Sequence, residues 1–132
     1  MLLASWEYNM YLNLEANPAK YQIQQCTDNS VTINTIVYSQ SILVMPQHLA
    51  SWRLNNVKDL AADHLLELAE LRPEIILLGT GCELIFPNPT VMQALFPNRI
   101  GVEVMTTAAA CRTYTALTSE YRNVLAALIV NT

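Results

Sequence analysis

The stretch that decides the fold is Pro73-Glu74-Ile75-Ile76-Leu77-Leu78-Gly79-Thr80-Gly81. Its middle is a short apolar run, and two glycines separated by one residue follow it. A run that is apolar at successive positions is typical of a strand buried on both faces of a parallel sheet. The stretch therefore predicts a central strand over residues 74–78 that ends in a tight turn.

The residues before this strand have helical periodicity. From Val57 onward the apolar positions recur with the spacing of one helix face. Asn56 is suited to cap the first turn, and Pro73 would end the helix at Arg72. We expect one helix over residues 57–72 whose inner stripe consists of Val57, Leu60, Ala61, His64, Leu65, Leu68 and Ala69.

The remaining elements follow from turn residues and apolar patterns. Upstream, the pattern predicts a hairpin over residues 21–33, an extension at 36–38 and a buried strand at 41–45 that Pro46 ends. Downstream, it predicts a short helix from Asn88 to Phe96, a strand over 100–105 and a helix over 108–117 capped by Thr106 or Thr107. A final helix, apolar nearly all round, is expected from Ser119 through Leu128.

This order predicts an α/β fold. Strand–helix–strand units imply a sheet with helices on both faces. We expect a single-domain three-layer sandwich, with a mixed central sheet and an N-terminal β-hairpin layer. Residues 1–20 are expected to form an N-terminal arm, and residues 21–132 the single α/β domain.

Composition bounds the class of protein. The chain has 132 residues, of which 52% are hydrophobic and only 14% charged, so we expect a compact domain with a surface that another protein or a second copy covers. The net charge is −4 and the seven basic residues are scattered, which argues against a nucleic-acid partner. No apolar run is long enough for a transmembrane helix. The absence of Lys or Arg before Lys20 and the odd number of cysteines favour a cytoplasmic location.

Ligands of open α/β sheets bind beyond the carboxyl ends of the strands. Those ends place Gly79, Thr80, Gly81, Cys82 and Glu83 after one strand, and Thr106, Thr107 and Arg112 after the next. These eight residues are the candidate site for a ligand or a partner.

Each part of this candidate site has two interpretations. The two glycines fit either a tight turn that needs positive φ or the close approach of a ligand. Thr106 and Thr107 fit either simple helix capping or an anion pocket that Arg112 completes. In the first case Arg112 would pair with a carboxylate such as Glu83 or Glu103.

Other chemistries have little support in the sequence. Two histidines and three separated cysteines form no metal-ligand spacing, so no metal and no cofactor are expected. Cys82 is the cysteine expected to be accessible, and a pairing of Cys82 with His48 has no spacing to recommend it. His64 falls within a helix stripe, which is a structural position. The catalytic residues, if the protein is an enzyme, are not identified by any pattern.

Two blocks of this sequence resemble a known family. The first is residues 73–81, and the second runs from Gly101 through Tyr114 to Ala126-Ala127-Leu128-Ile129, with residues 38–46 and Trp52 fitting upstream. The family consists of small α/β proteins of long-unknown function. It includes bacterial and archaeal stand-alone proteins and a mitochondrial assembly factor of respiratory complex I. The match covers roughly residues 21–130.

The resemblance implies a three-layer α/β sandwich with an added β-hairpin layer and no established enzymatic activity. It implies a non-catalytic interaction protein that helps to assemble a membrane-associated complex, with respiratory complex I as the candidate client. Binding of a small anion, or an enzyme activity, at the strand ends is the alternative. Two positions depart from the family pattern. Thr115 stands where asparagine is common, and Tyr121 stands where glycine is common, which implies ordinary helical backbone at Tyr121.

Overall fold

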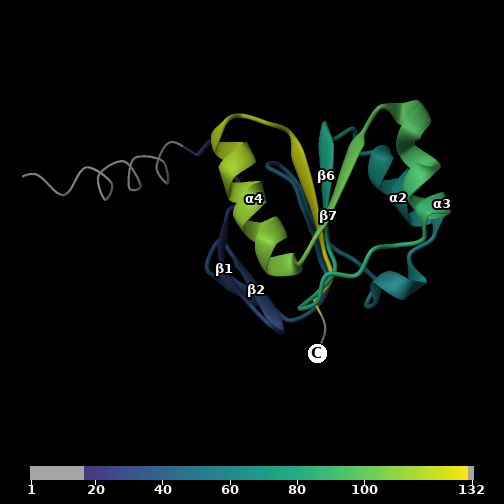
Figure 1. Ribbon diagram of the computed structural model, residues 1–132. Helices are drawn as coiled ribbons and strands as arrows, with labels where there is room; N and C mark the ends of the chain where they lie inside the picture. The colour runs from purple at the N-terminus through teal and green to yellow at the C-terminus, as the bar shows by residue number, and fades with distance from the viewer. Residues whose placement is uncertain (1–16, 131–132) are drawn as a thin grey trace, which may run out of the picture.

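The computed structural model describes residues 17–130 (Figure 1). Most of the expected N-terminal arm lies outside the described residues. The strands are β1 (Ile23–Thr27), β2 (Ser30–Ile33), β3 (Ile36–Tyr38), β4 (Ile42–Val44), β5 (Leu49–Ser51), β6 (Ile75–Gly79), β7 (Gly101–Met105) and β8 (Val124–Leu128). The α-helices are α2 (Ala62–Ala69), α3 (Pro89–Met92) and α4 (Thr107–Ser119), and two 3-10 helices span Val57–Asp59 and Gln93–Asn98.

The central sheet is mixed, as predicted. Its five strands lie in the order β5-β4-β8-β6-β7, with β6 parallel to both β7 and β8, and β4 antiparallel to β8. Helix α4 covers one face, and α2 and α3 cover the other (Figure 1). In β6, Ile76, Leu77 and Leu78 are fully buried, which confirms the central strand that the apolar run predicts.

The N-terminal hairpin is part of a separate three-stranded antiparallel sheet, in the order β1-β2-β3. Val31 and Ile33 of β2 are buried in the same apolar cluster as Tyr114 of α4 and Val44 of β4. This sheet therefore shares one face of the central sheet with α4. The predicted hairpin and its extension are both confirmed, whereas the short strand β5 is not predicted by the sequence pattern.

The predicted last helix is wrong, because residues 124–128 form strand β8. All five are fully buried between β4 and β6. A short apolar run can be a buried helix or a buried strand, and periodicity cannot separate the two. Ser119 ends α4 instead of capping a further helix.

The helix predicted over residues 57–72 is shorter and interrupted. A 3-10 turn at Val57–Asp59 is capped by Asn56, whose Oδ1 accepts the Lys58 N–H at 2.9 Å. The backbone at Leu60 is then extended, and α2 starts at Ala62. Nδ1 of His64 accepts the Ala61 N–H at 2.8 Å, so His64 satisfies a free donor at the new helix start. The predicted short helix at Asn88–Phe96 is present as α3 followed by a 3-10 helix.

Tyr121 does not have the helical backbone that its departure from the family pattern implies. Its φ is 64°, in the left-handed region. The Tyr121 N–H donates to the Thr118 carbonyl at 3.0 Å, and the Arg122 N–H donates to the Leu117 carbonyl at 3.1 Å. These two bonds form the Schellman ending of α4, in which glycine is the preferred residue. The chain direction into β8 therefore requires this conformation whatever residue occupies the position.

We expect Tyr121→Gly to stabilise the fold by about 0.5 kcal/mol, because the relief of left-handed strain exceeds the entropy that glycine adds to the unfolded chain. The side chain is 77% exposed, so little packing is lost. Thermal melts should compare wild type with Tyr121→Gly, Tyr121→Asn and Tyr121→Val. We expect the melting temperature to fall in the order glycine, asparagine, tyrosine, valine at this position, because a β-branched residue is least tolerant of left-handed backbone. A valine variant as stable as the glycine variant would contradict left-handed backbone strain at position 121.

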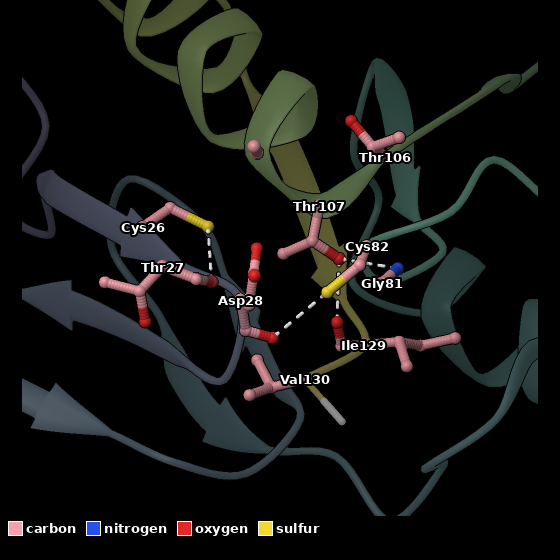
Figure 2. Close-up of a pocket in the computed structure, with 10 residues that line it drawn as sticks. Cys26, Thr27, Asp28, Gly81, Cys82, Thr106, Thr107, Ile129 and Val130 are labelled. Atoms are coloured by element: carbon pink, nitrogen blue, oxygen red, sulfur yellow. Dashed lines mark hydrogen bonds between the residues drawn. The ribbon is translucent and has the colours of Figure 1, made fainter. Parts of the chain in front are cut away.

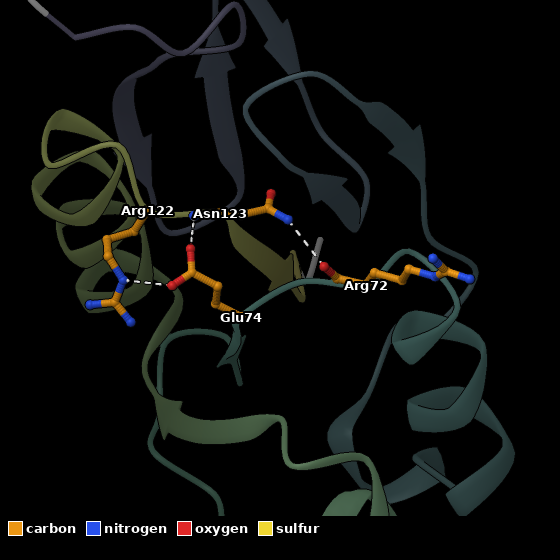
Figure 3. A network of polar contacts seen from close by, with 4 residues as sticks. All are labelled: Arg72, Glu74, Arg122 and Asn123. Carbon is orange, nitrogen blue, oxygen red and sulfur yellow. Dashed lines mark hydrogen bonds and ion pairs between the residues drawn. The ribbon is translucent and has the colours of Figure 1, made fainter.

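Two connections meet where β6 and β8 begin: the one between α2 and β6, and the one between α4 and β8 (Figure 3). The Glu74 carboxylate accepts the Asn123 N–H at 2.7 Å and Nε of Arg122 at 3.0 Å. The Asn123 side-chain amide donates to the Arg72 carbonyl at 3.1 Å. The hydrogen bond from the Asn123 backbone N–H, followed by the one from the Arg122 side chain, lowers the pKa of Glu74 below its ordinary value of 4.5.

The lowered pKa predicts the pH dependence of stability. A carboxyl whose pKa is lower in the folded state stabilises the protein above its unfolded pKa, and this contribution is lost as the pH falls through the folded pKa. Glu74→Gln should therefore lower the denaturation midpoint at pH 7, and the difference from wild type should shrink below about pH 4.5. Urea melts between pH 3 and pH 7 measure this. Glu67→Gln, an exposed change on α2, is the matched control. A constant difference from pH 7 to pH 3 would contradict the role of Glu74.

Candidate functional site

A small pocket lies at the carboxyl ends of β6 and β8, against the start of α4 (Figure 2). Its volume is about 100 Å³. It brings together four of the eight candidate residues, Gly81, Cys82, Thr106 and Thr107. The rest of its lining consists of Cys26, Thr27, Asp28, Ala108, Ile129 and Val130.

Thr107 connects the three elements that meet at this pocket. Its Oγ1 accepts the Gly81 N–H at 2.9 Å and donates to the Ile129 carbonyl at 2.7 Å (Figure 2). Its own N–H donates to the Gly81 carbonyl at 3.0 Å. Thr107 is buried, so these bonds fix the start of α4 on the strand ends. The helix cap itself is Thr106, whose Oγ1 accepts the Ala109 N–H at 3.3 Å.

The two glycines have different roles. Gly81 has a φ of 100°, as the tight-turn interpretation predicts. Gly79 is needed for space, because a Cβ there would lie 2.9 Å from both Cα and Oγ1 of Thr107. Neither glycine's role requires a ligand.

Thr80 and Glu83 shape the turn and do not line the pocket. The Thr80 side chain is buried, and its Oγ1 donates to the Glu83 carbonyl at 2.6 Å. The same oxygen accepts the Ile85 N–H at 3.3 Å. Glu83 is exposed at the surface.

Arg112 lies outside the strand-end pocket. It lines a separate groove of about 380 Å³ between β1 and α4, together with Ile23, Gln24, Gln25, Cys26, Ala108, Cys111 and Thr115. The charged residue that does line the strand-end pocket is Asp28, which repels anions. Thr106, Thr107 and Arg112 are therefore not brought together as one anion pocket. The expected ion pair of Arg112 with Glu83 or Glu103 is also wrong, since within residues 17–130 the ion pair formed is Glu74–Arg122.

The thiol of Cys82 is exposed and donates to the Asp28 carbonyl at 3.3 Å. Desolvation, followed by the charge of Asp28, raises the pKa of Cys82. The thiol is therefore protonated at neutral pH, which makes it a weak nucleophile. His48 does not line this pocket. Among residues 17–130, no group of three or more His, Cys, Asp or Glu side chains is placed to hold a metal ion.

Sequence reasoning missed the residues that the β1–β2 turn and the end of β8 contribute. Cys26 and Thr27, at the end of β1, and Asp28, in the turn that follows, reach the pocket from a distant part of the chain. The sequence pattern predicts a hairpin strand at Cys26 and a turn at Thr27 and Asp28, and neither prediction points to a site. Ile129 and Val130 are absent from the expected site because the sequence pattern predicts a helix where β8 lies.

Comparison with known proteins shows the family. Residues 23–129 match the model of a family described as a protein of unknown function, DUF498/DUF598. The chain belongs to this family. The expected resemblance is thereby confirmed. Within the described part of the chain, no helix has the length and apolar character needed to cross a membrane.

Two curated relatives of this family member have informative names. The chain is 30% identical over 119 residues to the Xenopus tropicalis NADH dehydrogenase [ubiquinone] 1 alpha subcomplex assembly factor 3. This match covers 88% of the chain and 65% of the relative. It is also 30% identical over 77 residues to a 13 kDa major membrane protein of Francisella tularensis, covering 58% and 63% of the two chains. The chain spans about half to two thirds of the length of the assembly factors that it matches.

Solved structures share the fold. A Bordetella parapertussis protein is 33% identical with a TM-score of 0.80, covering 86% of this chain and 98% of that one. A Xanthomonas campestris protein is 37% identical with a TM-score of 0.77, covering 84% and 85%. A Mth938-like domain of Bordetella pertussis is 27% identical with a TM-score of 0.75, covering 99% and 93%.

Proposed function

We propose that this protein is a non-catalytic assembly factor that binds a subunit of a membrane-associated respiratory complex, with complex I as the client. Support comes from the named assembly factors, which match up to 88% of this chain. Such a factor acts by binding, so it needs an exposed surface rather than a catalytic site. We further propose that it binds its client from the cytoplasm, where its three free cysteines would stay reduced.

The observation that carries this proposal is the exposure of two aromatic side chains in one connection. Phe86 and Phe96, between β6 and β7, are 70% and 71% exposed. Leu84, in the same connection, is also exposed. Exposed large apolar side chains mark interaction sites, and aromatic side chains often supply most of the binding energy. The same connection also contains Gly81 and Cys82, which line the strand-end pocket.

The experiment is a pull-down of the tagged full chain from detergent-solubilised membranes, read by mass spectrometry. Wild type should recover subunits of complex I, and a Phe86→Ser/Phe96→Ser double variant should lose at least nine tenths of them. Val37→Ser, at a 62% exposed position on β3, is the control and should bind as wild type. Equal melting temperatures of the variants show that folding is intact. Recovery without these subunits, or undiminished recovery by the double variant, would refute the proposal.

The groove between β1 and α4 favours small-molecule binding as a second candidate function. Its volume of about 380 Å³ falls in the range of ligand sites, whereas that of the strand-end pocket does not. Arg112 is its one charged lining residue, so the ligand class is an amphipathic carboxylate. Thermal melts with a series of short-chain fatty acids test this. A stabilisation that Arg112→Ala removes would support the candidate, and the absence of any shift would exclude this ligand class.

A further inference from the structure

The outer edge of β1 faces α4 across the groove described above. Within residues 17–130, β1 pairs with β2 alone, so the backbone N–H and C=O groups on its other edge have no partner strand. The groove of about 380 Å³ lies between this edge and α4. An unpaired strand edge readily accepts a further extended segment, which adds a strand to the sheet. The position of the groove therefore suits an extended segment that pairs with β1 and packs on α4.

The lining of the groove defines the side chains that such a segment needs. Its apolar or small residues are Ile23, Cys26, Ala108, Cys111 and Thr115. Gln24 and Gln25 line it as well, so Arg112 is the one charged residue of the groove. Arg112 is exposed and forms no ion pair with any residue of 17–130. The occupant therefore needs an apolar face and one acidic group.

The described part of the chain begins at one end of this groove. The Asn17 side-chain amide donates to the Thr115 carbonyl at 3.3 Å and to Oγ1 of Thr118 at 3.1 Å. These bonds fix Asn17, which is buried, on α4 beside a lining residue of the groove. Pro18 disfavours helical backbone at Asn17 and so favours an extended chain there. The chain that precedes Asn17 is therefore attached at the Thr115 end of the groove.

The sequence before Asn17 has the pattern of an amphipathic strand. From Ser5 to Glu15, apolar and polar residues alternate at every position but one. The apolar positions are Trp6, Tyr8, Met10, Leu12 and Leu14, and the polar positions are Ser5, Glu7, Asn9, Asn13 and Glu15. Alternation with a period of two predicts a strand that buries one face. Tyr11 is the exception, and its hydroxyl suits an outward position.

Connectivity fixes the direction of a segment that runs into Asn17 along the groove. β1 begins beside the C-terminal half of α4, where the Tyr114 hydroxyl donates to the Tyr21 carbonyl at 2.7 Å. It ends beside the start of α4, where Cys26 and Ala108 line the strand-end pocket. A segment that runs from the start of α4 to Asn17 is therefore antiparallel to β1.

We propose that residues 10–15 form an additional strand, antiparallel to β1, whose apolar side chains fill the β1–α4 groove. Six residues of strand span about 20 Å and the five residues of β1 span about 17 Å, so the lengths agree. The bulge of β1 between Ile23 and Gln25 bends its first part, so regular pairing covers Gln25–Thr27. The leucine and methionine side chains of the added strand face the groove, and its polar residues face solvent.

Glu15 supplies the acidic group. It lies two residues before Asn17, which is about 7 Å along an extended chain. Arg112 lies three residues before Thr115, which is about 4.5 Å along α4. The Glu15 carboxylate is therefore within reach of the Arg112 guanidinium, which extends past the strand to its solvent side. The carboxylate ligand of the second candidate function would have to displace this strand.

Hydrogen exchange of the full chain, read by mass spectrometry, tests the strand. In wild type the amides of residues 11–15 should exchange about tenfold or more slower than in a free peptide of the same sequence. Leu12→Asp/Leu14→Asp should exchange at the free-peptide rate, because its two new charges would be buried in the groove. Tyr11→Asp/Asn13→Asp adds two charges on the outward face and should keep the protection. Unchanged protection of β6 in each variant shows that the core is intact.

Charge reversal tests the ion pair separately. Glu15→Arg and Arg112→Glu should each raise the exchange rate of the strand amides about threefold, because like charges then meet at the surface. The double variant should restore the wild-type rate. Glu7→Arg makes the same change outside residues 10–15 and should have no effect. A double variant that exchanges as fast as its two parents would overturn this register.

Three further results would overturn the proposal. Strand amides that exchange at the free-peptide rate in wild type would leave the groove without this occupant. Equal loss of protection in both aspartate double variants would contradict the proposed inward and outward faces. Protection that falls on dilution would make a second copy of the chain the source of the strand. None of these results bears on the pull-down, because its variants lie in the connection between β6 and β7.

Discussion

Gly79→Ala should lower the free energy of unfolding by about 3 kcal/mol and the melting temperature by about 10 °C. The added Cβ would lie 2.9 Å from the Cα of Thr107, which is backbone and cannot turn away as a side-chain end can. It would also lie 3.2 Å from Leu128 of the neighbouring strand. Either α4 moves away from the sheet or β6 moves within it, and both loosen the core.

Gly101→Ala is the matched control for this prediction. Gly101 begins β7, and a Cβ there would have its nearest neighbour, Cγ1 of Ile75, at 4.0 Å. Its stability should stay within about 0.5 kcal/mol of wild type, because the new methyl group meets no crowded atom. Thermal melts of both variants measure the difference. Equal melting temperatures would show that α4 adapts to Gly79→Ala without cost, against the rigid contact described above.

Two apolar runs of the central sheet show which parts of the fold could be predicted from the sequence. The prediction of a strand before Gly79 is confirmed, because Pro73 and the two glycines limit the length of that apolar run. The pattern predicts a helix through residues 124–128 because Ser119 is suited to cap it and the run is apolar nearly all round, as in a buried helix. Its place between β4 and β6 overrides that local preference, and no local pattern encodes this place.

The candidate site was predictable to the extent that topology defines it. Parallel strands end at one edge of a sheet, so Gly81 and Thr107 were expected near each other, and they are hydrogen-bonded. Asp28 could not be predicted, because its contact with Cys82 joins residues 54 positions apart. Arg112 lies outside the strand-end pocket because of helix geometry. It comes five residues after Thr107 and therefore faces another side of α4, the side that Ala108 and Thr115 share.

Thr107→Val should destabilise the protein by about 3 kcal/mol, although the two side chains have nearly the same shape. Valine has no hydroxyl, so the Gly81 N–H and the Ile129 carbonyl each lose their bond to Oγ1 in a buried place. An unpaired buried group costs about 1–3 kcal/mol, which makes the loss larger than that of an ordinary cap. Denaturant melts measure the free energy, and hydrogen exchange at the Gly81 amide should become faster by at least tenfold.

Two neighbouring variants separate the hydroxyl from the rest of the residue. Thr107→Ser keeps Oγ1 and should cost less than about 1 kcal/mol, since it removes one methyl group. Thr106→Val removes the cap bond to Ala109 and should cost about 1 kcal/mol. If Thr107→Val were no worse than Thr106→Val, a water molecule would be replacing Oγ1, and the start of α4 would be held by packing rather than by this hydroxyl. The predicted order instead makes Thr107 the residue that fixes α4, and with it the pocket, to the carboxyl ends of β6 and β8.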